Sequence, residues 1–162
     1  MEIKELITQK LQVNFPEAGF EFSEFRNELS IKFKKIFINP ICKFLKDDSE
    51  LEFLLCEDIT AVDWATRKNR FTVVYHIFSI KNNFRLVLKS DVEENDCNID
   101  TVSSVWKTSD WQERECYDMY GIKFNNHPDM RRIYMPEEFE YHPLRKDFPL
   151  MGIPGSLPLP KK

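Results

Sequence analysis

The 162-residue sequence has neither a long hydrophobic run nor a recognisable targeting segment at its start. No stretch approaches the roughly 18 consecutive apolar residues that a membrane-spanning helix requires. The opening residues, MEIKELITQK, mix acidic and basic side chains, so they lack the apolar core of an export signal and the acid-poor composition of a transit peptide. These features predict a soluble protein without an export or import signal. Its length and its 42% of hydrophobic residues suffice for about one domain with its own core.

Cysteines are few and widely spaced. No pair among them has the C-x-x-C spacing that is typical of zinc sites and of iron–sulfur cluster motifs. Scattered thiols in a chain of this size favour reduced cysteines in a reducing compartment over a disulfide framework. The sequence therefore predicts no metal or cluster site and four free thiols: Cys42, Cys56, Cys97 and Cys116.

An excess of basic residues is also missing. Residues 121–162 carry seven Lys/Arg and five Asp/Glu, whereas residues 1–120 carry 16 and 22. The positive charges near the end are interleaved with negative ones and form no basic stripe of the kind that binds phosphate backbones. We therefore expect no nucleic acid as a partner.

The first 120 residues show the periodic patterns of both helices and strands. Apolar residues recur at helical spacing over 2–13, and they alternate with polar residues over 29–33, as in a half-buried strand. Asn39, followed by a proline, is the predicted N-cap of a short helix that ends at Lys46. Together these patterns predict an α+β fold with helices packed on a mostly antiparallel sheet. The further strands are expected over 51–60, 70–80, which is apolar on both faces, and from 84 to 88.

The last 42 residues differ in character from the rest of the chain. They contain seven of the nine prolines, which exclude a long helix or a central strand. They are also rich in apolar side chains, unlike a disordered tail. Ordering roughly 40 residues costs about 1 to 2 kcal/mol each in backbone entropy, so the segment needs a large surface to lie on. We therefore divide the chain into a body, residues 1–120, and an extended proline-rich C-terminal tail, residues 121–162, which we expect to wrap a partner and to be fully ordered only there.

A charged helix is predicted at the end of the body, from Trp111 to Tyr120. Ser109 fits the start of a capping box, and Gly121 fits the glycine that ends a helix. The helical spacing places Glu115 between apolar residues, where we expect it to pair with an arginine. It also places Arg114 and Asp118 one turn apart, as an ion pair.

This stretch contains residue types that catalysis uses, and we considered three kinds of active site. Glu113 and Glu115 are two residues apart on a helix, so they diverge and do not form the converging carboxylate pair of a hydrolase. Cys116 with His127 or His142 lacks a neighbour that would lower the pKa of the thiol. A metal site that used Cys116, Asp118 and the two histidines lacks a recognised ligand spacing. Buried ion pairs and hydrogen-bonded histidines are the favoured interpretation, and a stand-alone thiol or acid–base enzyme that uses Cys116, Glu115 and His127 is the alternative.

Three ordered motifs resemble those of a known family. ERECYDMYGIKFNNHPDMRRIY, from Glu113 to Tyr134, is similar to the signature of the C subunit, or 30 kDa subunit, of proton-translocating NADH:quinone oxidoreductase, respiratory complex I. EDITAVDW with RFTVVYHIFS resembles the family's sheet, and YHPLRKDFPLMG resembles its tail motif. The sequence departs from the pattern at Tyr141, where the family often has glycine. The signature positions are Glu113, Arg114, Glu115, Asp118, His127, Arg131 and Ile133.

The resemblance implies a structural and assembly subunit of the peripheral arm, without catalytic residues of its own. NADH, FMN, iron–sulfur clusters and quinone would be bound by other subunits. The tail would wrap the large 49 kDa-type subunit, which forms the quinone pocket with the cluster-bearing B-type subunit. The subunit would lie peripherally at the cytoplasmic face of a bacterial inner membrane, or at the matrix face of the inner membrane in a mitochondrion. A related membrane-bound hydrogenase or F420H2-type dehydrogenase is an open alternative. The implied interface or structural residues are Glu113, Arg114, Glu115, Asp118, His127, Arg131, Arg132, His142, Arg145, Asp147 and Phe148.

Overall fold

The computed structural model describes residues 2–66 and 68–149, and it has the predicted α+β architecture. A five-stranded sheet has the order β1-β2-β5-β4-β3. All neighbouring strands in it are antiparallel except β2 and β5, which run parallel, so the mostly antiparallel sheet is confirmed. The elements are α1 (Ile3–Asn14), β1 (Glu21–Phe25), β2 (Glu28–Lys32), a 3-10 turn η1 (Lys35–Phe37), α2 (Ile38–Asp47), β3 (Leu55–Asp63), β4 (Phe71–Ser79), β5 (Phe84–Val92), β6 (Asn98–Asp100), α3 (Ser109–Tyr120) and β7 (Lys123–Asn125).

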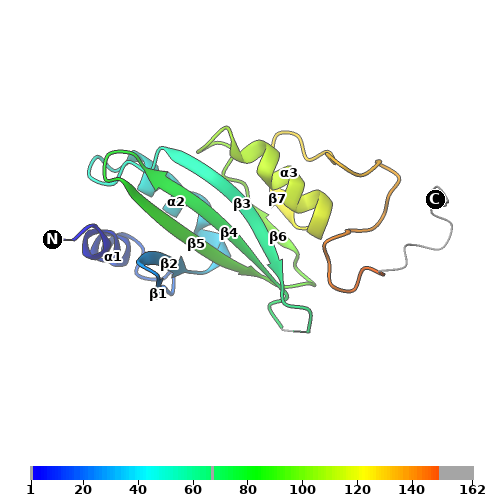
Figure 1. Cartoon of the computed structure of the whole chain (residues 1–162), viewed down its shortest axis with the longest axis horizontal. Helices are drawn as coiled ribbons and strands as arrows, with labels where there is room; N and C mark the ends of the chain where they lie inside the picture. Colours follow the sequence, from blue (N-terminus) through cyan, green and yellow to red (C-terminus); the bar gives the residue numbers. More distant parts are fainter. Residues whose placement is uncertain (1, 67, 150–162) are drawn as a thin grey trace.

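The core forms where the sheet meets the helices. Alternate residues of the inner strand β4, such as Tyr75 and Ile77, are fully buried, as are Ile7 of α1 and Ile41 of α2. Figure 1 shows α1 at the end of the molecule near β1 and β2, and α3 at the opposite side, beside β3. Both predicted N-terminal helices and the inner position of β4 are therefore confirmed.

Two local predictions in this part of the chain are wrong. Asn39 does not cap α2, because the helix already begins at Ile38 and the Asn39 side chain donates to the carbonyl oxygen of Thr101. The strand expected over 51–60 starts only at Leu55, because the chain before it turns to bury Leu51 and Phe53 under the end of α2. Strand β1, which pairs with β2 across a tight turn, was not predicted from its sequence pattern.

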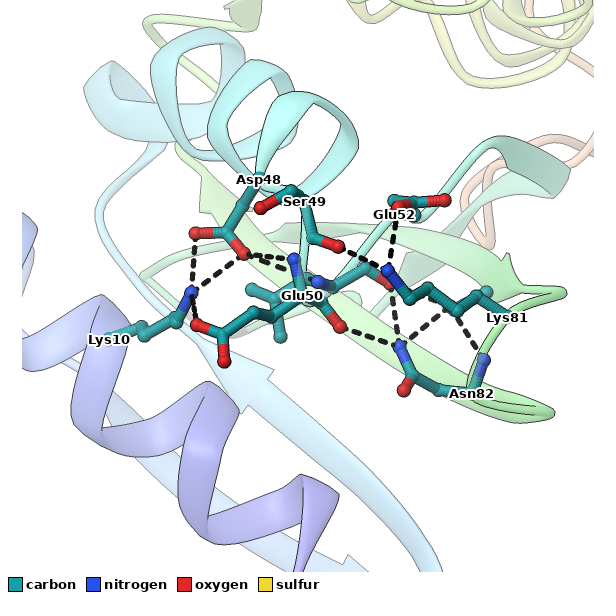
Figure 2. A network of polar contacts seen from close by, with 9 residues as sticks. Lys10, Asp48, Ser49, Glu50, Glu52, Lys81 and Asn82 are labelled. Atoms are coloured by element: carbon teal, nitrogen blue, oxygen red, sulfur yellow. Dashed lines mark hydrogen bonds and ion pairs between the residues drawn. The ribbon is translucent and has the colours of Figure 1, made fainter.

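A polar network joins α1, the loop 48–52 that follows α2, and the β4–β5 turn (Figure 2). Lys10 of α1 reaches the carboxylate of Asp48, which follows α2, at 2.7 Å, and also that of Glu50 at 2.6 Å. Asn82 in the β4–β5 turn donates to the carbonyl oxygen of Glu50, and Lys81 pairs with the Glu52 carboxylate. The network fixes the loop that leads from α2 into β3.

The helix α3 covers the outer edge of the sheet. Side chains of Gln112 and Cys116 donate to the carbonyl oxygens of Glu57 and Ile59 in the edge strand β3. This arrangement satisfies backbone groups that an exposed edge strand would leave open for aggregation. After α3 the chain returns through β7, which pairs in parallel with β6, so the first residues of the predicted tail are part of the body.

Candidate functional site

The charged residues of α3 meet the chain that follows β7, which we call the C-terminal segment, residues 126–149. It runs along α3, bends away from the body in an open arc and returns to the C-terminal end of α3 (Figure 1, orange). Glu113, Arg114 and Asp118 are buried, whereas Glu115 is exposed. The predicted divergence of Glu113 and Glu115 is therefore confirmed. The expectation that Glu115 is the buried carboxylate is wrong, because the helix presents Glu113 to the core.

Glu113 is held in the core by groups that donate hydrogen bonds. Its Oε1 accepts from the backbone N–H of Val102 at 2.7 Å, and its Oε2 is in contact with the Thr101 hydroxyl. The imidazole Nε2 of His127 lies 3.8 Å from Oε2. Burial raises the pKa of Glu113 to about 7, although these hydrogen bonds act in the opposite direction. Glu113 thus ties α3 to the loop after β6 and lies against the start of the C-terminal segment.

Arg114 holds the next part of the segment by its backbone. Its Nε donates to the carbonyl oxygen of Arg131 at 2.9 Å, and its Nη2 donates to that of Arg132 at 3.3 Å. The guanidinium also stacks over the indole of Trp111, 4.8 Å from the ring centroid. The predicted Arg114–Asp118 ion pair is therefore wrong, because both side chains bind the returning chain rather than each other.

Asp118 accepts four hydrogen bonds from the C-terminal segment. Its Oδ2 accepts hydrogen bonds from the successive backbone N–H groups of Ile133, Tyr134 and Met135, at 2.7 to 3.0 Å. Its Oδ1 accepts from Nη1 of Arg132 at 2.9 Å, and both side chains of this pair are almost completely buried. Burial alone would raise the pKa of Asp118, but the three backbone donors and Arg132 lower it. A single carboxylate therefore fixes the course of four consecutive residues.

The end of α3 is capped by the returning part of the segment. Helix C-termini leave their last carbonyl groups without partners inside the helix, and here the last four all accept hydrogen bonds. Gly121, which has a φ of 76°, ends the helix as predicted, and a Cβ at this position would lie 2.5 Å from Nε2 of His142. Burial lowers the pKa of His142, which fits a neutral ring that donates from Nδ1. The donors are Gly121 N to Tyr117, His142 Nδ1 to Asp118, Leu144 N to Met119 and Arg145 Nε to Tyr120.

A second cluster fixes the segment to the sheet. Arg70 and Asp63 form a buried two-bond pair at 3.0 and 3.1 Å, and Asp147 joins it at 2.9 Å from Arg70. Asp63 also accepts from the backbone N–H of Lys146 at 2.8 Å. Despite burial, the hydrogen bonds from Arg70 and from backbone groups lower the pKa of Asp63 to about 2. This pair was not predicted as part of the site, although Asp63 lies in the quoted EDITAVDW motif.

The structure brings together most of the residues that the sequence singled out. Arg131 pairs with Asp129 at the surface, and Phe148 is half-buried beside Phe139, with ring centroids 6.4 Å apart. Arg145 and Asp147 make their described polar contacts with their own chain. The segment as far as residue 149 is thus held by its own body, because α3 supplies partners for its backbone. Residues 150–162, the rest of the predicted tail, lie outside the described residues.

The thiols at the site are buried and protonated. Burial raises the pKa of the Cys116 thiol far above its usual value, and it raises that of Cys56 to about 12, so neither is a ready thiolate nucleophile. Within residues 2–66 and 68–149, no group of three or more His, Cys, Asp or Glu residues is placed to hold a metal ion. In the same part of the chain, no helix is both long and apolar enough to cross a membrane.

Exposed apolar side chains surround the buried contacts. Trp111, Tyr134 and Leu144 are each more than half exposed, and Tyr141 is 47% exposed. Aromatic side chains of this kind are enriched in protein–protein interfaces. The arrangement therefore presents an apolar surface whose backbone is fixed from below by buried charges.

Comparisons with known proteins agree on one family. A family model described as the respiratory-chain NADH dehydrogenase 30 Kd subunit matches residues 31–154. The NADH-quinone oxidoreductase C subunit of Geotalea uraniireducens is 50% identical over 143 residues, which are 88% of this chain and 86% of the relative. That of Geobacter metallireducens is 49% identical over 150 residues, 92% of this chain and 91% of the relative.

Two solved structures share the fold. A chain described as Nqo5 of the trypsin-resistant fragment (1-134) aligns with a TM-score of 0.68 and 24% identity, over 80% of this chain and 99% of that one. A chain of the membrane-bound sulfane sulfur reductase, an archaeal respiratory membrane complex, aligns with a TM-score of 0.75 and 22% identity, over 91% of this chain and 86% of that one.

Proposed function

The chain belongs to the family of the 30 kDa subunit of respiratory-chain NADH dehydrogenase, and from this premise we propose that it is a non-catalytic structural and assembly subunit of the peripheral arm of complex I. It acts within a multi-subunit complex that transfers electrons from NADH to quinone. In this role it binds no cofactor itself, and NADH, FMN, iron–sulfur clusters and quinone belong to other subunits.

One observation carries the proposal. The buried charged groups of α3 bind backbone groups of their own chain instead of converging on a cavity. Arg114 donates hydrogen bonds to two carbonyl groups of the C-terminal segment, and Asp118 accepts hydrogen bonds from three of its N–H groups. Groups satisfied in this way position a chain and are not free to act on a substrate.

The partners that we propose are the large 49 kDa-type subunit and the cluster-bearing B-type subunit. The C-terminal segment and the residues beyond it would brace the large subunit near its quinone pocket. An exposed apolar surface with a fixed backbone suits this role, because a partner gains contact area without the cost of ordering a mobile chain. Through the complex, the subunit would lie peripherally at the cytoplasmic face of a bacterial inner membrane, or at the matrix face in a mitochondrion.

Two alternatives make different predictions. The fold shared with the sulfane sulfur reductase chain leaves open a related complex, such as a membrane-bound hydrogenase or an F420H2-type dehydrogenase. The curated relatives at 45 to 50% identity favour NADH and quinone instead. A stand-alone thiol enzyme is disfavoured by the raised pKa of Cys116. Membranes that contain the assembled complex should oxidise NADH with a quinone acceptor, whereas activity of the isolated chain would support the thiol enzyme.

The test uses surface variants that leave the fold intact. In the double variant Tyr134→Ala/Leu144→Ala, co-purification of the 49 kDa-type and B-type subunits from native membranes should fall sharply, together with NADH:quinone activity. The control Ile36→Ala/Ile80→Ala removes equally exposed apolar side chains from η1 and the β4–β5 turn. Both purified variants should unfold at the temperature of the wild type. Equal assembly of the two variants would refute the proposed docking surface.

A further inference from the structure

Glu113 is a fully buried carboxyl group, and no Lys or Arg among the described residues forms an ion pair with it. Its hydrogen-bond partners are the Thr101 hydroxyl and the backbone N–H of Val102, and its nearest acidic neighbour is Asp110. A buried carboxylate without a bound cation is costly, and such a group usually takes up a proton instead. The other titratable groups that face it are thiols, a phenol and an imidazole: Cys42 from α2, Cys56 from β3, Tyr75 from β4, Cys116 from α3 and His127 from the C-terminal segment.

These thiol and phenol groups supply no positive charge. Burial raises the pKa of each of them, so all are neutral at pH 7. The hydroxyl of Tyr75 is buried and has no hydrogen-bond partner among the described residues. The imidazole of His127 is the group by which the C-terminal segment approaches Glu113.

The ring of His127 is fully buried and its protons can be assigned. The backbone N–H of Asp129 donates to Nδ1 at 3.0 Å, so Nδ1 carries a lone pair. Nε2 then carries the hydrogen, which it donates to the carbonyl oxygen of Asp110 at 3.2 Å. Nε2 is also 3.7 Å from the Asp110 carboxylate and 3.8 Å from that of Glu113. The geometry is that of a neutral ring that links the start of the C-terminal segment to the first turn of α3.

We propose that Glu113 and His127 form a proton-dependent latch between the loop 101–103, helix α3 and the turn 127–129, closed when Glu113 carries a proton. The latch goes beyond the proposed assembly role and does not depend on it. Its two states differ by one proton, and solvent supplies or receives that proton.

In the closed state the Glu113 carboxyl and the Thr101 hydroxyl each donate to an acceptor. The protonated Oε2 of Glu113 donates to Oγ1 of Thr101, and the Thr101 hydroxyl donates to Oγ of Ser103 at 2.8 Å. The second lone pair of Oγ1 accepts from the backbone N–H of Ser103 at 3.1 Å. The His127 ring keeps both of its backbone contacts.

Loss of the proton disturbs this arrangement. If Glu113 ionises, the core contains a negative charge that no Lys or Arg among the described residues compensates. That charge lies 3.8 Å from the His127 ring and against the Thr101 hydroxyl, so ionisation weakens the packing of α3 on the turn 127–129 and on the loop 101–103. Burial raises the pKa of Glu113 to about 7, which places the transition near neutral pH.

The sign of the pH dependence follows from the raised pKa of Glu113. A carboxyl group whose pKa is higher in the folded than in the unfolded chain binds more protons when folded. Stability therefore falls as pH rises between the unfolded value, 4.5, and about 7, and it stays low above that range. One proton changes the folding equilibrium constant by roughly tenfold per pH unit across this window.

The experiment is urea unfolding of the full 162-residue chain from pH 5 to 8.5. We compare the wild type with Glu113→Gln, whose amide can donate to Thr101 as the protonated acid does, and with Glu115→Gln, the exposed control on the same helix. The folding constant of the wild type, divided by that of Glu113→Gln, should fall with pH, so that Glu113→Gln is the more stable protein at pH 8. Glu115→Gln should follow the wild type at every pH.

Two results would overturn the latch. A constant ratio of wild type to Glu113→Gln between pH 5 and 8.5 would show that Glu113 does not change its protonation in this range. A wild type that is more stable than Glu113→Gln at pH 8 would show that the carboxylate is the favoured form. If Glu113→Gln fails to fold, infrared spectra of the wild type labelled with carbon-13 in glutamate decide. A buried protonated-carboxyl band at pH 6 that disappears by pH 8 supports the latch, and absence of this band at pH 6 refutes it.

Discussion

Replacing Asp118 by asparagine tests whether one carboxylate fixes the course of the C-terminal segment. In the wild type, Oδ2 accepts hydrogen bonds from three backbone N–H groups, and Oδ1 accepts one from the Arg132 guanidinium. An asparagine has a single acceptor oxygen. Whichever way the amide is turned, its NH2 group faces a donor, either Arg132 or the N–H groups at 133–135. The variant thus keeps the volume of the side chain and removes the match of donors to acceptors.

The expected loss is large for a single isosteric change. Breaking one side of a buried ion pair costs about 3 to 5 kcal/mol when the remaining charge has no other partner. Arg132 retains the carbonyl oxygen of Tyr141, which it contacts at 3.2 Å, so part of that cost is avoided. Unmatched buried N–H groups add roughly 1 kcal/mol or more each. We expect a total loss of about 2 to 4 kcal/mol. The loss cannot exceed the free energy with which the segment itself binds to α3.

Trypsin cleavage under native conditions measures this local binding. Arg131 and Arg132 are cleavage sites within the held stretch. When opening is fast compared with cleavage, the cleavage rate reports the population of the open form. A loss of about 2 kcal/mol should accelerate cleavage at these two sites roughly 30-fold. Rates measured in the same variants in urea correct for any change in the intrinsic cleavage rate.

The matched control is Asp129→Asn. Asp129 pairs with Arg131 at 2.6 Å, but this pair lies at the surface. Surface ion pairs contribute little to stability, so the corrected cleavage rate should stay near that of the wild type. If Asp118→Asn and Asp129→Asn are cleaved equally fast, the segment is not held by Asp118, and the scaffold role of α3 is refuted.

Two further variants test the other attachment points. Gly121→Ala should lower the thermal unfolding temperature more than Gly19→Ala. Both glycines have a positive φ, so alanine costs about 1 kcal/mol in backbone strain at either position. Only the Cβ at 121 also collides with the capping ring of His142, whereas the Cβ at 19 meets the flexible end of a lysine at 3.4 Å. Equal losses from the two would contradict the cap. Asp63→Asn should cost about 2 kcal/mol at pH 7, because its pKa is lowered from 3.8 to about 2. In the wild type that stability is present above pH 4 and is lost as pH falls towards 2. Denaturant unfolding should therefore show the free energies of unfolding of the two proteins converging in acid. A constant difference down to pH 2 would count against the role of Arg70.

The pattern of apolar residues predicted the body of the fold well. Period-two alternation and helical spacing depend on which face of an element is buried, so they identified α1, β2, β4 and β5 correctly. The exposed hairpin strand β1 has little buried surface, and therefore little alternation that could reveal it. Asn39 was assigned as a cap from local propensity, whereas a long-range contact with Thr101 determines its position.

Charged residues were harder to predict than apolar ones. Spacing on the helix put Arg114 and Asp118 within reach of each other, and that local pair was the natural expectation. Their actual partners lie 14 to 18 residues further along the chain, and most are backbone groups, which have no signature in the sequence. The same limit explains why Glu115 was taken for the buried carboxylate. One of its apolar neighbours, Trp111, is 63% exposed and does not mark the core.

The contacts of α3 change the energetics expected for the tail. Fixing the backbone costs about 1 to 2 kcal/mol per residue, which suggested that a partner must supply the surface. In the structure, α3 and the Asp63–Arg70 pair hold the segment near residues 127, 131–135 and 142–147. A partner that binds this segment therefore meets a surface already ordered and does not bear the full entropic cost of forming it. It follows that Asp118→Asn, which touches no exposed side chain, should weaken assembly through the loss of this preorganisation alone.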